Sequence, residues 1–354
     1  MGRMEAMLVS LREQGGSDLH LAAGQPPRMR RKGSLDPIEG EPVLDDAALR
    51  ALLREIATPE QWQAYEQQRD LDFAYGIPGV ARFRANYFAQ RNGAGAVFRI
   101  IPEEILTLEQ LELPRAIRQF AHLDRGLVLV TGPTGSGKST TLAAIINEIN
   151  ESYAKHVLTI EDPIEFVHPN KQCVFSHREV GIHTGGFAPA LRAALREDAD
   201  VILVGEMRDY DTISLALTAA EMGALVFGTL HTNGAAKTID RVIDAFPADE
   251  QPQARLSLSE SLAGVVSQQL LRTADGKGRC AANEVLIRTT GLANVIREGN
   301  TPMLLNIMQS GKTAGMQTMD DALLALVQAN RIRPKDAYFK ATEKARFEKY
   351  APAD

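Results

Sequence analysis

Cysteine is scarce in this sequence of 354 residues, and long apolar runs are missing from it. The two cysteines, Cys173 and Cys280, are far apart and form no CxxC pair, which excludes a disulfide framework and a four-cysteine zinc site. The longest apolar runs, at 127–130 and 201–204, are far too short to span a bilayer. The N-terminus has acidic residues and no long apolar core, unlike a signal peptide. We therefore expect a reduced, cytoplasmic protein with no integral membrane segment.

An excess of positive charge is missing as well. The net charge is −6, which argues against a general nucleic-acid binder. The one tight basic cluster, RMRRK at 28–32, is interpreted as a solvated turn or a subunit contact. No nucleic-acid partner is therefore expected.

The patterning predicts two domains. Residues 1–102 are typical of a small mixed domain, with a strand at 17–22, a helical stretch at 45–68, and a strand at 82–87 whose hairpin partner is 94–101. Residues 103–114 are predicted to be a linker. From 115 to 354, short apolar strands alternate with helices, which indicates a mostly parallel sheet covered on both faces. From about Ser257 onwards we expect mainly amphipathic helix.

The stretch GPTGSGKS at 132–139 fits the pattern G-x-x-x-x-G-K-[ST] and follows an apolar strand. Such glycines let backbone N–H groups curl around phosphate oxygens, and the next helix adds its positive N-terminal end. Lys138 is expected to reach the β and γ phosphates, and the Ser139 hydroxyl to ligate Mg²⁺. We therefore predict that ATP and Mg²⁺ are bound by Gly132, Thr134, Gly135, Ser136, Gly137, Lys138, Ser139 and Thr140.

Carboxylates follow two further strands. Glu206 comes directly after the apolar strand at 201–204, where binding crevices of parallel sheets open, and is predicted to serve the metal together with Ser139. The segment TIEDPIEF crowds Glu161, Asp162 and Glu165 after another strand, and Pro163 stiffens its turn. A hydrolase needs a base aligned with the γ-phosphate. These residues alone leave both Glu161 and Glu165 open as that base.

His231 ends a third apolar strand, at 224–230. A histidine at this place is either a structural hydrogen-bonding group or a sensor of the γ-phosphate, and the sequence alone does not separate the two.

In this order the motifs make the chain resemble the secretion and type IV pilus motor ATPases, in particular the pilus retraction ATPases. The resemblance covers nearly the whole chain, through SDLHLAAGQPP, ARFRANYFAQRNGAGAVFRIIP, TGPTGSGKSTTLAA, TIEDPIEFVH, ALREDADVILVGEMRD, GTLHTNGAAKTIDRVID and GMQTMDDAL. It implies an α/β protein with a small PAS-like α+β N-terminal domain and a RecA-like P-loop motor domain that ends in a helical part. It also implies a homohexameric ring at the inner-membrane base of the pilus machine, with the membrane platform protein as its partner. A second retraction ATPase is left open as a further partner.

The resemblance also implies roles for single residues. Glu165 takes the role of general base, Glu206 serves the Mg²⁺ side, and His231 belongs to a histidine box. Three arginines fall in strands that bring guanidinium groups towards the nucleotide, where they act either as arginine fingers or as partners in interface salt bridges: Arg82, Arg84 and Arg99.

Two positions depart from the family pattern. Ala224 stands where an earlier histidine of the histidine box is frequent, and Ala293 stands where an arginine is usual in a short C-terminal helical motif. Three other functions compete with retraction. They are an assembly or type II secretion ATPase, a nucleic-acid translocase with the same core, and a catalytically idle ring subunit.

Overall fold

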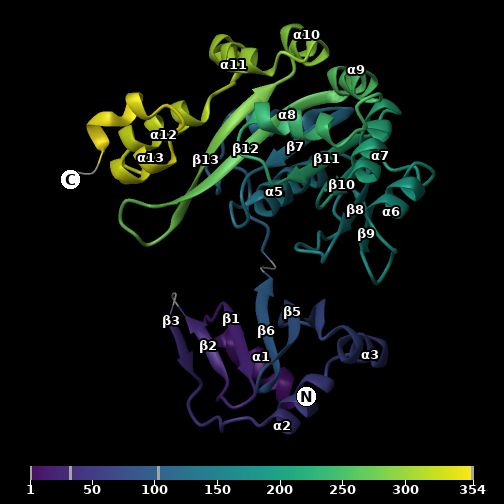
Figure 1. Ribbon diagram of the computed structural model, residues 1–354, viewed down its shortest axis with the longest axis vertical. Helices are drawn as coiled ribbons and strands as arrows, with labels where there is room; N and C mark the ends of the chain where they lie inside the picture. Colours follow the sequence, from purple (N-terminus) through teal and green to yellow (C-terminus); the bar gives the residue numbers. More distant parts are fainter. Residues whose placement is uncertain (1, 32–33, 102–103, 352–354) are drawn as a thin grey trace. The chain divides into compact units, whose positions relative to one another are not determined.

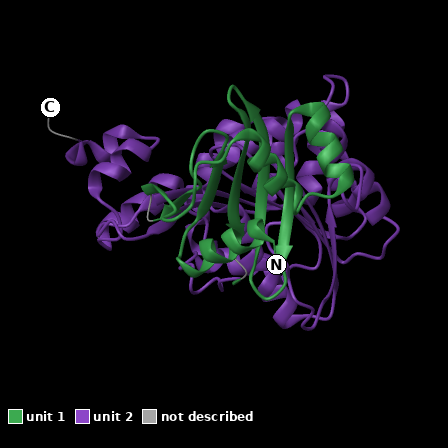
Figure 2. Ribbon diagram, turned by 90° about the horizontal axis from the view of Figure 1, so that it is seen from below, with its two compact units in different colours: residues 1–104 green, residues 105–354 purple. Residues whose placement is uncertain are grey.

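The computed structural model describes residues 2–31, 34–101 and 104–351, and the chain divides into two compact units. Unit 1 comprises Met1–Glu104 and unit 2 comprises Ile105–Asp354 (Figure 2). The linker at 103–114 stays a prediction. Its first residue lies outside the described ranges, and from Ile105 the segment belongs to unit 2, where Leu108 is buried in the core.

Unit 1 is an antiparallel sheet with three helices (Figure 1). Its strand order is β3-β2-β1-β6-β5-β4, and every neighbouring pair is antiparallel. In chain order its elements are α1 (Arg3–Glu13), β1 (Asp18–Ala22), β2 (Arg28–Arg31), β3 (Ser34–Pro37), α2 (Asp46–Arg54), α3 (Pro59–Gln68), β4 (Asp70–Ile77), β5 (Ala81–Gln90) and β6 (Gly93–Ile101).

The predicted hairpin of unit 1 is confirmed, because β5 pairs with β6 from Arg82 to Gln90 and from Gly93 to Ile101. Alternate residues of β5 are buried, as its alternation of apolar and polar residues predicts: Ala81, Phe83, Ala85 and Tyr87. The predicted single helical stretch at 45–68 is instead two helices. Thr58 begins the second with a capping box to Gln61, and Pro59 occupies its first turn, where a missing N–H is tolerated.

Unit 2 is built on a seven-stranded sheet of order β13-β12-β7-β11-β10-β8-β9, in which only the β12–β13 pair is antiparallel. The elements that form its sheet and the helices between them are α4 (Arg115–Arg118), β7 (Gly126–Thr131), α5 (Lys138–Ser152), β8 (His156–Glu161), β9 (Val174–Glu179), α6 (Phe187–Ala194), β10 (Val201–Val204), α7 (Tyr210–Glu221), β11 (Leu225–Leu230), α8 (Ala235–Asp244), α9 (Gln251–Ser261), β12 (Leu262–Arg272) and β13 (Arg279–Ile287).

Helices cover both faces of this sheet (Figure 1). On β7, Leu127 and Leu129 pack in a core with α6, α7, α8 and α9, whereas Val128 and Val130 pack in a second core with α5. All residues of β7 and β11 are buried, which explains their continuous apolar runs. The expected α/β class with a mostly parallel sheet is therefore confirmed.

The prediction that the chain is mainly helical from about Ser257 onwards is wrong. Residues 262–287 form the two long strands β12 and β13, and β12 lies inside the sheet, between β13 and its parallel neighbour β7. The run LAGVVSQQLL is apolar on both faces near its start, so no period distinguishes it from a buried helix. Helices follow only afterwards, as α10 (Thr290–Glu298), α11 (Leu304–Ser310), α12 (Met319–Gln328) and α13 (Pro334–Lys340).

None of the helices in the described part of the chain has both the length and the apolar character needed to cross a bilayer.

Candidate functional site

Four neighbouring parallel strands of unit 2 end at one edge of the sheet. They are β7, β11, β10 and β8, and residues predicted to act on nucleotide follow each of them. The phosphate loop follows β7, His231 follows β11, Glu206 follows β10 shortly after its end, and Glu161 is the last residue of β8. The sequence therefore places its separate motifs at one site because parallel strands share the direction of their carboxyl ends.

The phosphate loop has the backbone that its glycines predict. Gly135 and Gly137 have φ angles of 76° and 86°, in the left-handed region that favours glycine. Helix α5 begins at Lys138, directly after Gly137, and no side chain caps its first turn. The N–H groups of a first turn and the positive end of a helix form an anion site.

The Lys138 side chain folds back onto the backbone of this loop. Its Nζ donates to the carbonyl oxygens of Gly132, at 3.0 Å, and Pro133, at 3.2 Å. Burial lowers the pKa of Lys138 below its usual value, and the carboxylates of Glu206 and Glu165 oppose that shift. These two acids are therefore near enough to act on the lysine that is predicted to meet the phosphates.

Glu206 is held by two basic side chains. Arg208 binds both of its carboxylate oxygens, with Nε 2.6 Å from Oε1 and Nη2 2.6 Å from Oε2. His231 Nε2 lies 3.1 Å from Oε1. Burial would raise the pKa of Glu206, but the bonds and charge of Arg208, with His231 and Lys138, outweigh it and lower the pKa. Glu206 is therefore ionised, and its contact with His231 links the segments that follow β10 and β11.

The two acids that the sequence left open as the base occupy different positions. Glu161 is buried at the end of β8, and its Oε2 accepts a hydrogen bond from the Glu165 backbone N–H at 3.1 Å. A second buried acid, Glu179 on β9, accepts from Ile164 N–H at 3.1 Å. These bonds fix the turn that carries the half-exposed Glu165 side chain. Glu161 thus shapes the site, and the role of Glu165 as base stays a prediction.

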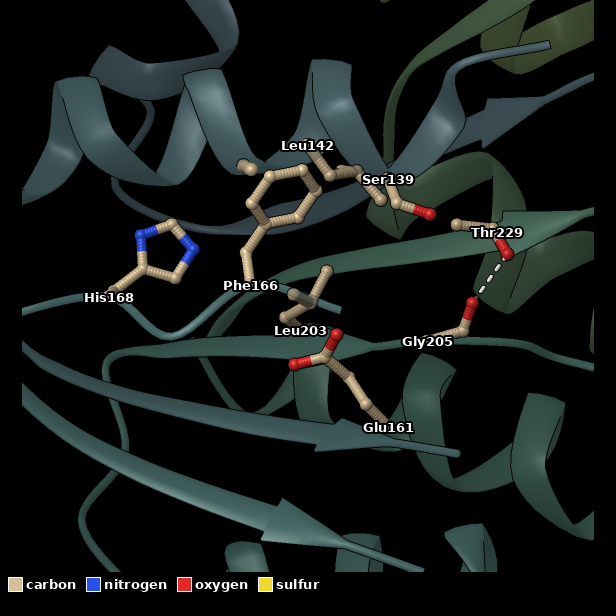
Figure 3. Close-up of a pocket in the computed structure, with 9 residues that line it drawn as sticks. Ser139, Leu142, Glu161, Phe166, His168, Leu203, Gly205 and Thr229 are labelled. Atoms are coloured by element: carbon tan, nitrogen blue, oxygen red, sulfur yellow. Dashed lines mark hydrogen bonds between the residues drawn. The ribbon is translucent and has the colours of Figure 1, made fainter. Parts of the chain in front are cut away.

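A small pocket opens between α5 and the ends of the strands (Figure 3). Its volume is about 20 Å³, which is enough for one water molecule. The carboxylate of Glu161 points towards it from β8, while Ser139 and Leu142 close it from α5 (Figure 3). Across the pocket, Thr229 Oγ1 donates to the carbonyl oxygen of Gly205 at 2.5 Å. Ser139 therefore lines the same cavity as an acid, Glu161, and as the strand that precedes Glu206.

The donor set at this edge fits a hard divalent cation such as Mg²⁺. The Ser139 hydroxyl and the Glu206 carboxylate supply oxygen ligands, which Mg²⁺ prefers. In the described part of the chain no three His, Cys, Asp or Glu side chains come close enough to hold a metal ion by themselves. A cation here would therefore need oxygens from a bound phosphate and from water, as Mg²⁺ usually has.

The three predicted arginines lie in unit 1. Arg84 on β5 and Arg99 on β6 are directly opposite each other in the hairpin. Arg99 Nε lies 2.7 Å from Asp18 Oδ1, and Arg84 Nε lies 3.7 Å from Asp72 Oδ1. Arg82, two residues before Arg84 on the same strand, also has an interaction partner. Their action on a nucleotide stays a prediction.

Sequence reasoning missed two residues at this site. Arg208 lies two residues after Glu206, but nothing in the sequence around it predicts that it binds that carboxylate. His168 closes the pocket beside Phe166 (Figure 3), and nothing in its sequence neighbourhood indicates this place. Asp209, one residue after Arg208, caps the start of α7 by accepting a hydrogen bond from the Thr212 N–H.

The family of type II/IV secretion system proteins matches residues 5–346, and the chain belongs to this family. The type IV pilus retraction ATPase PilT of Pseudomonas aeruginosa is 52% identical over 329 residues, covering 93% of this chain and 95% of the relative. A twitching motility protein of Neisseria gonorrhoeae is 53% identical over 290 residues, or 82% and 78% of the two chains. The crystal structure of the pilus retraction motor PilT with bound ADP has a TM-score of 0.91 and 42% identity, with 99% of each chain covered. The chain is thus a homologue of the pilus retraction ATPases.

Proposed function

We propose that this protein is a Mg²⁺-dependent ATPase that works as a homohexameric motor and powers the retraction of type IV pili. The observation that carries the proposal is the phosphate loop with Lys138 beside the carboxylates of Glu206 and Glu165, in a chain so similar to a retraction ATPase. By the same homology, the ring works in the cytoplasm at the inner-membrane base of the pilus. The platform protein there is its expected partner, and a second retraction ATPase stays open as a further one.

In this mechanism the loop glycines and the start of α5 bind the β and γ phosphates, and Lys138 balances their charge. When bound, Mg²⁺ would neutralise further charge at the phosphate oxygens. Ser139 and Glu206 are the residues that would hold it. The Glu206 carboxylate would help to hold the cation, while Arg208 bonds both of its oxygens. Glu165 accepts a proton from the attacking water, on a turn that Glu161 and Glu179 hold in place.

The chemical part of the proposal is tested by Glu165→Gln with Glu161→Gln as the matched variant. General bases contribute about 10²–10⁴-fold, so Glu165→Gln is expected to lower kcat by at least about 100-fold while ATP still binds. Glu161→Gln keeps an oxygen that can accept from the Glu165 N–H, so its kcat should fall by less. Hydrolysis by Glu165→Gln at the wild-type rate would show that this residue is not the base.

The cellular part is tested by counting surface pili and measuring twitching in cells that lack the gene. Excess pili without twitching are expected if the protein retracts pili. Bald cells would indicate an assembly ATPase instead, and unchanged pili would argue for a different machine. ATPase activity stimulated by DNA would favour the translocase.

A further inference from the structure

Gln268 on β12 is a buried polar residue directly beneath the phosphate loop. Strand β12 runs parallel to β7, and the last paired residues are Ser267 and Thr131, so Gln268 follows at the level where β7 gives way to the loop. Its side chain is 2% exposed. A buried amide is held in place only when both its oxygen and its nitrogen are hydrogen-bonded.

Both ends of this amide are bonded to the nucleotide-binding segment. The Gln268 Nε2 donates to the Ser136 carbonyl oxygen at 2.6 Å, and the Thr141 hydroxyl donates to the Gln268 Oε1 at 2.8 Å. Lys138 and Ser139, which are predicted to meet the phosphates and the metal, lie between these two attachment points in the sequence. One side chain therefore links the phosphate loop to the first turn of α5.

The backbone of the loop is fitted to Gln268 as well. A Cβ atom on Gly132 would lie 2.2 Å from the Gln268 carbonyl oxygen, and one on Gly137 would lie 2.8 Å from Gln268 Nε2. Both distances are shorter than any normal contact of a Cβ atom. Gly137 is thus small partly because the Gln268 side chain occupies the adjacent space, whereas Gly132 is crowded by the backbone of residue 268.

The bond to Ser136 also determines where an N–H group points. In a planar trans peptide the C=O and the following N–H are directed oppositely. Because the Ser136 carbonyl points towards Gln268 Nε2, the Gly137 N–H of the same peptide points away from Gln268. That is the direction in which a bound phosphate oxygen is expected.

We propose that Gln268 is a positioning residue, which holds the Gly137 N–H and the start of α5 in the geometry that binds the phosphates of the nucleotide. It touches no reacting atom. The proposal rests on nucleotide binding by this loop, which belongs to the proposed function, but it does not depend on pilus retraction.

Two substitutions separate hydrogen bonding from simple packing. Gln268→Leu fills similar space and removes both bonds, so the dissociation constant and the KM for nucleotide should rise about tenfold, the equivalent of one net hydrogen bond to a buried group. The kcat should change less than the KM. Gln268→Glu keeps an acceptor for Thr141, but an ionised carboxylate would face the Ser136 carbonyl oxygen and repel it.

The pH profile of Gln268→Glu gives a readout that a merely structural role would not move. A buried carboxyl group titrates above its usual range, and its protonated form can again donate to Ser136. We therefore expect its affinity for fluorescent ADP to recover as the pH is lowered from 8.5 to 6, relative to wild type at the same pH. Gln268→Leu should stay weak throughout.

The matched controls are Gln269→Leu and Gln269→Glu, because alternate residues of a strand face opposite sides and Gln269 is not among those bonded to the loop. They should bind ADP like the wild type. Thr141→Val removes only the bond to α5 and should give part of the loss. All variants are first compared by thermal melting, and binding is measured per folded protein.

Wild-type affinity in Gln268→Leu, an equal loss in Gln269→Leu, or a flat pH profile in Gln268→Glu would each overturn the proposal. Failure of the wild-type protein itself to bind ADP would instead overturn the proposed function. The two failures are thereby distinguishable.

Discussion

The fold holds His168 neutral beside the candidate site, and this makes a strong prediction about acid stability. The side chain is 4% exposed, and its Nδ1 is buried with no hydrogen-bond partner in the described part of the chain. Its ring stacks on Phe175, with centroids 5.0 Å apart, and next to His177, at 6.1 Å. Burial is the main cause that lowers the pKa of His168 to about 3, and the positive charges of His177 and Lys171 add to it.

The magnitude follows from the difference between the folded and unfolded chain. Unfolding returns the pKa of His168 to about 6.5, so the unfolded chain binds more protons between pH 6.5 and 3. The contribution of neutral His168 to stability is complete above pH 6.5 and is lost as the pH falls towards 3. At about 1.4 kcal/mol per pH unit, the loss between pH 6.5 and 4 is on the order of 3 kcal/mol.

The assay compares the wild type with His168→Phe, which keeps an apolar ring for the stack and cannot titrate. Urea unfolding followed by circular dichroism should show the wild type losing about 3 kcal/mol relative to the variant between pH 7.5 and 4. Trp62, the single tryptophan, lies in unit 1, so its fluorescence follows a part of the chain without His168 and serves as an internal control. The protein concentration is kept constant because association would shift the transition. Parallel pH curves for the two proteins would refute the reasoning.

Two more predictions concern the core and the C-terminal helices. Gly228→Ala on β11 would place a Cβ 2.2 Å from Met207 Sδ, so thermal melting should show a loss of about 1–3 kcal/mol, partly recovered by adding Met207→Ala. Asp321 on α12 would have its pKa raised by burial, but bonds from Arg346 at 2.7 Å and Lys312 at 2.9 Å lower it to about 2. Its stabilising effect is present above pH 3.8 and is lost as the pH falls through 2, so in denaturant titrations Asp321→Asn should cost on the order of 2 kcal/mol at pH 7 and little near pH 2.

The motifs of the site could be predicted from the sequence because each is local. A glycine pattern with a lysine after an apolar strand, or an acid at the end of one, is visible within ten residues, and parallel strands then bring the motifs to one edge. The contacts between motifs could not be predicted in the same way. Gln268 reaches Ser136 across 132 positions of sequence, and no pattern in either segment indicates the other.

The hairpin of β12 and β13 was missed for a different reason. Leu262 to Ser267 are buried on both faces because β12 lies inside the sheet, so the alternation that marks an exposed strand is absent. The amphipathic hairpin β5–β6 was found because one face of its sheet is polar. Sequence patterns therefore identify this amphipathic hairpin more readily than a buried strand such as β12, which begins directly after α9 with no turn residues between them.

The crowded acids at this edge do not repel an anion as strongly as their number suggests, because the fold pairs them. Glu206 is bound by Arg208 and approached by His231, and Glu161 accepts a backbone N–H. Lys138 is buried, which lowers its pKa, and the carboxylates of Glu206 and Glu165 oppose that effect. An incoming phosphate therefore meets, at the positive end of α5, a lysine whose charged form these acids favour. At long range these carboxylates repel a phosphate. At short range they favour the positive charge of Lys138, which binds it.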